Sequence, residues 1–400
     1  MNNANIAKKA RNVAAVVSEI IRDVKKNGDK ALFKFEKRFN GVTLTSSSIK
    51  YTKKDFSKAF EKLPPAARKH LKKIAQRILR YQKKIASVYK DVLVRRGSLK
   101  IKHRFIPIET VALYVPSGTG GMSGRFYYPS SIIMNAMPAM AVGVKKIYAA
   151  TSAVSDVVLG CCWLSGVSSL YRISGAQAIA SFAFGTESVP KADFIAGPGN
   201  VYVTEAKRQL QGTVGIDVLA GPSEIAVIAD ESVEKEWLLY DIAAQLEHAP
   251  EARAFLITPS KVLYNFIKGV FGRRVSVFHI KSANDQIKKL EEIAPEHALI
   301  MTENPSNYSG KINKSGAVFL GKYSAVAMGD YTAGPSHTLP TAGGAVFSSG
   351  LNPGTFLRSS AEISYDKKSF ETDAAAAAFL AEAEGMFNHR KSIIIRGKKL

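Results

Sequence analysis

The sequence predicts an α/β fold built on two doubly wound parallel sheets, with a helical N-terminal arm and a small C-terminal tail. Three observations predict it. The chain has 400 residues, more than one ordinary hydrophobic core can organise. Strand and helix patterns alternate after residue 104, which is the order that a parallel sheet with covering helices requires. Gly-Pro loops end several of the predicted strands, so we expect both sheets to be Rossmann-like.

We expect the chain to divide into four parts. The N-terminal arm covers residues 1–20, one α/β domain is made of 21–114 and 223–351, a second Rossmann-like domain covers 115–222, and the tail covers 352–400. The sequence has no internal repeat of the length that builds solenoids. Each part should therefore be a distinct structure rather than a copy of its neighbour.

The first hundred residues are expected to be mostly helical, and they are strongly basic. Helices are predicted in an arm up to about residue 21, then over 30–39, 53–63 and 66–88. Residues 1–100 contain 27 Lys or Arg against 7 Asp or Glu, whereas the whole chain has a net charge of +23. Lys and Arg alternate with apolar residues at helical spacing, so we expect a solvated basic face rather than a nucleic-acid surface. The alternative is a basic RNA-binding protein, whose binding would weaken steeply with salt.

The predicted elements after residue 104 fall into two alternating runs. The first run has strands 110–116, 146–150, 170–174 and 192–196, with helices 130–143, 155–165, 176–184 and 201–210. The second run has strands 224–229, 254–258, 275–280 and 298–302, with helices 233–248, 260–271 and 284–293. The rest is expected to be loop-rich, with an alanine-rich helix over 372–386 and a short final strand over 392–396.

The composition is that of a soluble globular protein in a reduced compartment. Hydrophobic residues make up 46% and charged residues 22% of the chain. No apolar stretch reaches the roughly 18 residues of a membrane span, and the polar N-terminus lacks a secretion signal. The two cysteines, Cys161 and Cys162, are adjacent within an apolar run, so we expect them to pack in a core. We therefore expect a cytoplasmic protein without disulfides.

Two glycine-rich loops follow predicted strands, and a third closes the same half of the chain. The loop from Gly118 to Gly124 nearly matches G-x-G-x-x-G, with Ser123 at the third position. The others are Gly197-Pro-Gly-Asn200 and Gly221-Pro-Ser223. Such loops can serve as plain turns. Because nucleotides bind at strand ends along one edge of a parallel sheet, the three together also favour a phosphate-bearing cofactor.

The histidines suggest a metal site. Gln245 and His248 are three residues apart on a predicted helix, which would place both on one face as half of a divalent-metal site. His297, His337 and His389 each also have a carboxylate or an amide within seven positions. Imidazole, carboxylate and amide oxygen together suit zinc or a similar metal. The remaining histidines, His70, His103 and His279, are expected to be structural.

Glu296 and His297 form a separate acid–base candidate. Neighbouring side chains on a strand diverge, so the two are not expected to bind one metal ion together. A histidine that titrates near neutral pH, beside a glutamate able to activate water, suits proton transfer.

Eleven motifs occur in one order along the chain: Tyr114-Val-Pro, Tyr128-Pro-Ser-Ser, Gly175-Ala-Gln177-Ala-Ile-Ala, Phe184-Gly-Thr-Glu-Ser-Val-Pro-Lys191, Gly197-Pro-Gly-Asn200, Thr204-Glu-Ala-Lys-Arg208, Ala220-Gly-Pro-Ser-Glu224, Gln245-Leu-Glu-His248, Ala294-Pro-Glu-His297, Gly329-Asp-Tyr331 and His337-Thr-Leu-Pro-Thr341. On these motifs the sequence resembles the histidinol dehydrogenase family over nearly its full length. The resemblance implies oxidation of L-histidinol to L-histidine, the last step of histidine biosynthesis. The reaction would use two NAD-dependent hydride transfers and pass through enzyme-held L-histidinaldehyde.

The resemblance also implies roles for individual residues. The ligands of one zinc ion per subunit would be Gln245, His248, Asp330 and His389, with zinc acting as a substrate anchor. His297 would be the general base, and Glu296 would activate water. Ser223, His337 and Glu384 would contact the substrate together with the zinc ligands and His297, while Tyr114, Gln177 and Asn200 would contact NAD. The domain over 115–222 would then be the NAD-contacting one.

The family further implies a homodimer with shared active sites, in which the tail carries Glu384 and His389 to the partner's site. The sequence departs from the family in the loop after Tyr114, which reads Val-Pro-Ser-Gly and is longer, and in the segment before His389. Within the enzyme class, the alternative is a paralogue that oxidises another primary alcohol, such as a sulfonated diol. Outside that class it is a non-catalytic binding protein on the same scaffold.

Overall fold

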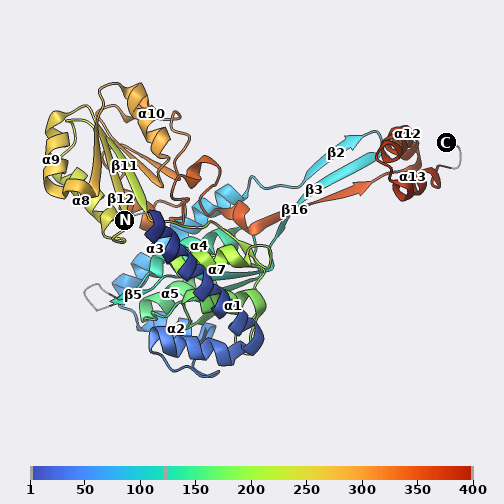
Figure 1. Ribbon diagram of the computed structural model, residues 1–400, viewed down its shortest axis with the longest axis horizontal. Coiled ribbons are helices and arrows are strands. Elements are labelled where there is room, and N and C mark those ends of the chain that lie inside the picture. The colour runs from blue at the N-terminus through green and yellow to red at the C-terminus, as the bar shows by residue number, and fades with distance from the viewer. Residues whose placement is uncertain (1–2, 120–124, 398–400) are drawn as a thin grey trace. The chain divides into compact units, whose positions relative to one another are not determined.

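The computed structural model describes the backbone of residues 3–119 and 125–397, and the side chains of 12–117 and 127–397 (Figure 1). The chain forms two compact units. The larger unit contains Met1–Ala86 and Ile108–Phe356, and the smaller unit contains Ser87–Pro107 and Leu357–Leu400. The predicted α/β fold with parallel sheets is confirmed. Among the described residues, no helix combines the length and the apolar character needed to cross a membrane.

The first sheet of the larger unit has six strands in the order β1-β8-β7-β4-β9-β10. They are β1 (Lys50–Thr52), β4 (Thr110–Tyr114), β7 (Lys146–Ala150), β8 (Ser169–Tyr171), β9 (Phe194–Ala196) and β10 (Gly215–Ile216). Only the edge strand β1 pairs antiparallel. The chain moves outward from β4 through β7 to β8 and then returns to the other side of β4. The strand order therefore reverses between β4 and β9, where doubly wound sheets form a ligand crevice.

Helices cover both faces of this sheet (Figure 1). They are α1 (Asn3–Asn40), α2 (Lys53–Lys62), α3 (Pro65–Ala86), α4 (Pro129–Ala141), α5 (Asp156–Leu164), α6 (Gly175–Phe184) and α7 (Val201–Leu210). Side chains of β4 alternate between the two cores: Ala112 and Tyr114 pack with α1, α6 and α7, whereas Val111 and Leu113 pack with α2 to α5. The buried strand is therefore apolar on both faces, as its sequence predicts.

The second sheet is fully parallel, with the order β13-β12-β11-β14-β15. Its elements are β11 (Glu224–Ala229), α8 (Lys235–Leu246), β12 (Arg253–Thr258), α9 (Lys261–Phe271), β13 (Val275–His279), α10 (Ala283–Ile293), β14 (His297–Met301), β15 (Ala317–Leu320) and α11 (Val326–Tyr331). One expectation needs correction here. The helix predicted to run through His248 ends at Leu246, so Gln245 lies in its last turn and His248 lies beyond it.

The smaller unit is built on an antiparallel sheet in the order β16-β3-β2. Its elements are β2 (Val92–Arg96), β3 (Leu99–Pro107), β16 (Leu357–Ser364), α12 (Lys367–Ala383) and α13 (Phe387–Ile394). The final strand predicted over 392–396 is wrong, because Ser392 to Ile394 continue α13. Its run of isoleucines favours a strand locally, but here the segment packs against α12 as a helix.

The remaining elements are short. They are the antiparallel pair β5 (Gly118–Thr119) and β6 (Arg125–Phe126), and the 3-10 turns η1 (Gly272–Arg274), η2 (Pro305–Asn307), η3 (Gly344–Val346) and η4 (Pro353–Phe356). The glycine-rich loop predicted after Tyr114 falls partly on residues 120–124, which lie outside the described residues.

The sheets divide the chain at places other than those expected. The expected domain of 21–114 and 223–351 would separate β4 from 115–222, yet β4 pairs with β7 on one side and β9 on the other. Residues 87–107 join the C-terminal segment, because β3 pairs with β16 along its length. The expected break before residue 30 is a kink inside α1, where Gly28 has a φ of +49°.

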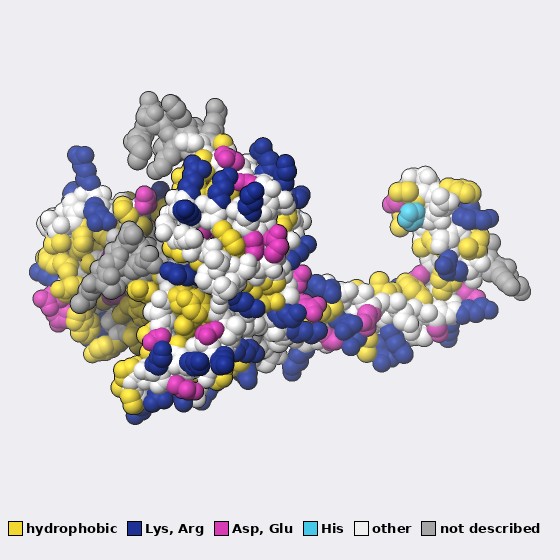
Figure 2. All heavy atoms as spheres, turned by 90° about the horizontal axis from the view of Figure 1, so that it is seen from below, with side chains coloured by type: hydrophobic (Ala, Val, Ile, Leu, Met, Phe, Trp, Pro, Cys, Tyr) yellow, Lys and Arg dark blue, Asp and Glu magenta, His cyan; other side chains and the backbone are white. Residues whose placement is uncertain are grey.

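The basic N-terminal block lies at the surface. Helix α3 contains no acidic residue, and Lys69, Lys73 and Arg77 are exposed on it. Lys and Arg side chains recur over the face seen in Figure 2, separated by side chains of other kinds. This pattern matches the solvated helical face that the spacing predicts.

Candidate active site

A cavity of about 290 Å³ in the larger unit collects half of the twelve predicted site residues. Its walls come from the ends of β4 and β9 in the first sheet and from the beginnings of β11 and β14 in the second. Six predicted residues line it: Ser223, His248, Glu296, His297, Asp330 and His337. Since β11 and β14 are parallel neighbours with Ile225 opposite His297, their amino ends bring Glu224 next to the acid–base candidate.

The backbone of Glu224 holds both members of that candidate pair. Its N–H donates to Glu296 Oε2 over 3.0 Å, and its carbonyl oxygen lies 3.1 Å from His297 Nδ1. A carbonyl can only accept, so Nδ1 carries the hydrogen and Nε2 keeps its lone pair. Glu296 Oε2 lies 3.7 Å from His297 Nδ1. The pair is therefore fixed in orientation, and the imidazole is left with one basic nitrogen.

Burial shifts the pKa values of Glu296 and His297 in opposite directions. Both side chains are at most 7% exposed. Burial raises the pKa of Glu296 to about 8, against the opposing hydrogen bonds from Glu224 and Ser223. Burial lowers the pKa of His297 to about 4. His297 is thus a neutral base at pH 7, and Glu296 becomes an ionised base as the pH rises through about 8.

His337 is oriented by two partners. Its Nδ1 lies 3.2 Å from the carbonyl oxygen of Asp330, and its Nε2 lies 3.2 Å from Ser131 Oγ. The carbonyl again requires a hydrogen on Nδ1, so the Ser131 hydroxyl donates to Nε2. Burial lowers the pKa of His337 to about 4, which keeps the ring neutral. A neutral imidazole in this wall of the cavity can orient a polar substrate group.

Gln245, His248 and Asp330 offer donors that fit a divalent metal. Gln245 is 3% exposed, and its Nε2 has no hydrogen-bond partner among the described residues. Burial lowers the pKa of His248, which keeps the ring neutral, and raises the pKa of Asp330 to about 6. A neutral imidazole and a desolvated carboxyl group are groups that a bound cation would satisfy, and the amide oxygen of Gln245 could serve as a further ligand.

One chain supplies only part of such a site. Across the part of the chain that the structure describes, no group of three or more His, Cys, Asp or Glu side chains could hold a metal ion. The other two residues predicted for the site, Glu384 and His389, belong to the smaller unit and do not line this cavity. The predicted ligand set is thus divided between the two units, with Gln245, His248 and Asp330 in the larger and His389 in the smaller.

A second cavity of about 480 Å³ lies where the order of the first sheet reverses. Tyr114, Gln177 and Asn200, the three residues predicted to contact NAD, all line it. The Tyr114 hydroxyl accepts the N–H of Gly175 over 3.1 Å, at the start of α6. Asn200 Oδ1 caps α7 by accepting two backbone N–H groups. The first turns of two helices thus face this cavity, an arrangement suited to an anionic cofactor.

The Glu36 carboxylate holds Ser174 and Gln177 in the wall of the second cavity. Its side chain is fully buried, and Oε1 accepts the Ser174 N–H over 3.0 Å and Gln177 Nε2 over 2.8 Å. Its other oxygen accepts Asn40 Nδ2 over 2.7 Å. Burial raises the pKa of Glu36, and these three donors oppose the shift. The amide of Gln177 therefore has one preferred orientation.

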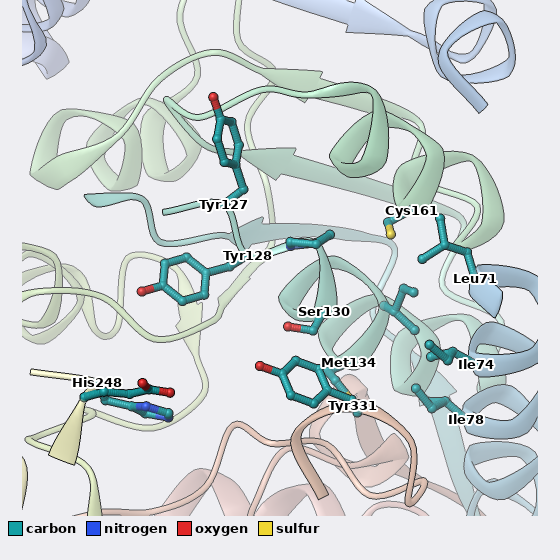
Figure 3. Close-up of a pocket in the computed structure, with 13 residues that line it drawn as sticks. Leu71, Ile74, Ile78, Tyr127, Tyr128, Ser130, Met134, Cys161, His248 and Tyr331 are labelled. Carbon is teal, nitrogen blue, oxygen red and sulfur yellow. The ribbon is translucent and has the colours of Figure 1, made fainter. Parts of the chain in front are cut away.

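A third cavity, of about 450 Å³, adjoins the first (Figure 3). The two share Tyr128, Ser130, His248 and Tyr331. Its other walls are mainly apolar side chains of α3 and α4, with Cys161 of α5. Figure 3 shows the Tyr331 and Ser130 side chains between this apolar lining and His248.

Sequence reasoning missed Glu224, Ser131 and Glu36. Glu224 was visible as a charged residue that opens an apolar strand, and Ser131 belongs to the motif beginning at Tyr128. No local signal distinguishes Glu36 from the other charges of its helix, because two of its three partners, Ser174 and Gln177, lie more than 130 positions away.

Comparisons with known proteins agree with one another. The family model for histidinol dehydrogenase matches residues 4–397. Histidinol dehydrogenase of Listeria innocua is 38% identical over 418 residues, covering 98% of this chain and 95% of its own length. That of Methanocaldococcus jannaschii is 36% identical, covering 95% of this chain and 92% of its own. The crystal structure of histidinol dehydrogenase from Elizabethkingia anophelis superposes with a TM-score of 0.86 at 27% identity, covering 98% and 96% of the two chains.

Proposed function

The chain belongs to the histidinol dehydrogenase family, and from this premise we propose that it oxidises L-histidinol to L-histidine as the last step of histidine biosynthesis. The observation that carries the proposal is the buried Glu296–His297 pair, held by the Glu224 backbone in a cavity next to a cofactor-sized crevice. One alcohol, one water and two NAD⁺ give one carboxylate, two NADH and three protons. The site must therefore move protons twice and admit one water.

His297 is the base for the alcohol step. Its Nε2 takes the hydroxyl proton while the carbon loses hydride, because Nδ1 is committed to the Glu224 carbonyl. The low pKa of His297, about 4, keeps this nitrogen unprotonated at neutral pH. The same low pKa makes the imidazolium a strong acid, so the proton passes on readily to water.

Glu296 is the base for the aldehyde step. In its ionised form the carboxylate takes a proton from a water that adds to the aldehyde carbon. The resulting hydrate then loses the second hydride and becomes the acid. The Glu224 N–H donates to one carboxylate oxygen of Glu296 and so fixes the orientation of this base in the cavity.

The remaining residues bind and orient the substrate and cofactors. Zinc, when bound by Gln245, His248, Asp330 and His389, would grip the substrate imidazole and amine, and NAD beside Tyr114, Gln177 and Asn200 would accept the hydrides. Ser223 and His337 contact the substrate from the cavity wall, and Glu384 does so from the tail. Cys161 and Cys162 remain free, buried thiols, in keeping with a cytoplasmic enzyme.

The working enzyme is a homodimer with shared active sites. This part of the proposal is supported by membership of the histidinol dehydrogenase family, which implies a dimer in which the tail reaches the partner's site. The tail of one protomer would carry both residues to the partner's cavity. Each complete site then needs two chains.

The proposal is tested directly by identifying the alcohol that the enzyme oxidises. Purified protein loaded with zinc is incubated with NAD and either L-histidinol or other primary alcohols, including a sulfonated diol, and the products are identified by mass spectrometry. The proposal expects NADH and L-histidine from histidinol. NADH from another alcohol, with none from histidinol, would instead select a paralogous dehydrogenase.

A further inference from the structure

Two loops separate the cavity of the acid–base pair from the cofactor cavity. The first loop, Gly197 to Asn200, follows β9, and the second, Val218 to Ser223, precedes β11. Pro198 and Gly199 line the acid–base cavity, while Asn200 lines the cofactor cavity. The second loop supplies four consecutive residues, 220–223, to the acid–base cavity. The first loop thus borders both cavities, and the second loop borders the acid–base cavity.

A buried ion pair beneath these loops joins them. Lys207 of α7 and Asp217 are each 2% exposed at the side chain, and they contact each other directly. Lys207 Nζ also donates to the carbonyl oxygens of Gly197, over 3.1 Å, and of Val218, over 2.9 Å. All three ammonium hydrogens are therefore used, and two of them hold the first residue of each loop.

Asp217 also binds the backbone of the first loop. Asp217 Oδ2 accepts the Gly197 N–H over 2.7 Å, so the ion pair binds both backbone groups of Gly197. Gly197 has a φ of +112°, and a Cβ there would collide with the carbonyl oxygen of Tyr114. The ion pair thus holds the first loop close to the end of β4, where Tyr114 lines the cofactor cavity.

The same helix makes a further link to the second loop. Thr204, one turn before Lys207, donates its hydroxyl to the carbonyl oxygen of Ala220 over 3.1 Å. Burying two charges is costly, and replacing such a pair by apolar residues is often neutral or stabilising. A pair that holds three backbone groups in two functional loops is therefore better explained by positioning than by stability.

We propose that Lys207 and Asp217 are positioning residues that set the distance between the substrate and cofactor cavities for hydride transfer. They do so by holding the Gly197–Asn200 and Val218–Ser223 loops together. The inference rests on the proposed function, because hydride transfer is the step that depends on this distance. A misplacement of about 1 Å can reduce such a step about a hundredfold.

The test replaces the whole pair with apolar residues. The double variant Lys207→Met/Asp217→Leu leaves no unpaired buried charge, so it is expected to fold. Three backbone groups lose their partners, so its melting temperature should be lower than that of the parent. Its kcat should fall roughly tenfold or more, its KM values for histidinol and NAD should change little, and the deuterium isotope effect from histidinol labelled at the alcohol carbon should rise. Arg208→Met is the matched control, because it breaks an exposed ion pair with Glu205 on the same helix, and it should leave all of these values unchanged.

Two results would overturn the inference. One is a folded double variant with the kcat and isotope effect of the parent, which would make the pair merely structural. If the double variant does not fold, the near-isosteric Thr204→Val decides: the inference requires a lower kcat and a larger isotope effect at unchanged melting temperature, and parental values refute it. Failure of the proposed function is distinguishable, because the unmodified enzyme would then make no NADH from histidinol.

Discussion

At the scale of single residues, the chemistry depends on where two buried groups place their protons. Glu296 and His297 are adjacent in sequence and lie in one desolvated cavity, yet burial raises one pKa and lowers the other. Motif recognition could single out this pair from the sequence. It could not assign the reactive nitrogen, because that depends on the Glu224 carbonyl, 73 positions earlier.

The pKa of Glu296 predicts how the aldehyde step responds to pH. Oxidation of L-histidinal should accelerate as pH rises and level off above pH 8, since the carboxyl group loses its proton near a pKa of about 8. The initial rate of NADH formation from the aldehyde, measured across this range, checks it. Glu296→Gln should be slow at every pH, and a variant that keeps the parental pH profile would assign the titration to another group.

His297→Asn separates catalysis from binding. The amide cannot act as a base, so kcat for histidinol oxidation should fall by about 10²- to 10⁴-fold. Bound zinc, measured by elemental analysis, and histidinol affinity, measured by calorimetry, should both be retained. Loss of the metal from this variant would show that the division of roles between His297 and Gln245–His248 is wrong.

At the scale of elements, the bounds of buried helices and strands with a regular apolar pattern could be predicted. The exposed strands of the smaller unit could not. β7, α7 and β11 have the predicted bounds, because their apolar pattern is also their burial pattern. The hairpin of β2 and β3 and its partner β16 were missed, since most of their residues are exposed and carry no clear alternation. His248 was placed on a helix that ends two residues earlier. Helix ends depend on capping contacts more than on periodicity.

The junction of α1 and α6 gives a prediction for cofactor binding. In Glu36→Gln an amide NH2 group replaces one of the two carboxylate oxygens. One of these oxygens accepts hydrogen bonds from Ser174 and Gln177, and the other accepts one from Asn40. With one of these hydrogen bonds lost, the KM for NAD should rise roughly tenfold while the KM for histidinol stays unchanged. Steady-state kinetics with each substrate varied checks this, with Glu61→Gln on the exposed face of α2 as the control. Equal changes in both KM values would contradict a role confined to the cofactor cavity.

At the scale of the whole molecule, the sequence could indicate the family but not how the chain divides. The β3–β16 pairing joins segments about 260 positions apart, and no local pattern predicts it. This pairing forms the smaller unit, to which Glu384 and His389 belong. The acid–base cavity, by contrast, lies in the larger unit.

A shared site predicts that two inactive variants can complement each other. When His297→Asn and His389→Ala are mixed and allowed to exchange subunits, each hybrid dimer regains one site with an intact cavity and an intact tail. Activity should recover to at most about a quarter of the parental value, because half of the dimers are hybrids with one working site. Subunit exchange is confirmed by differently tagged chains, and exchange without recovered activity would place the whole site in one protomer.

The central claim is that one site performs both oxidations, with a base for each. It is tested most directly by incubating a limiting amount of L-histidinol with excess NAD and counting the NADH formed when the substrate is exhausted. The account predicts about two NADH per histidinol for the parent. For Glu296→Gln it predicts about one in the first phase, because no carboxylate activates the water that adds to the aldehyde. One NADH per histidinol from the parent enzyme, with the aldehyde released as the final product, would contradict it.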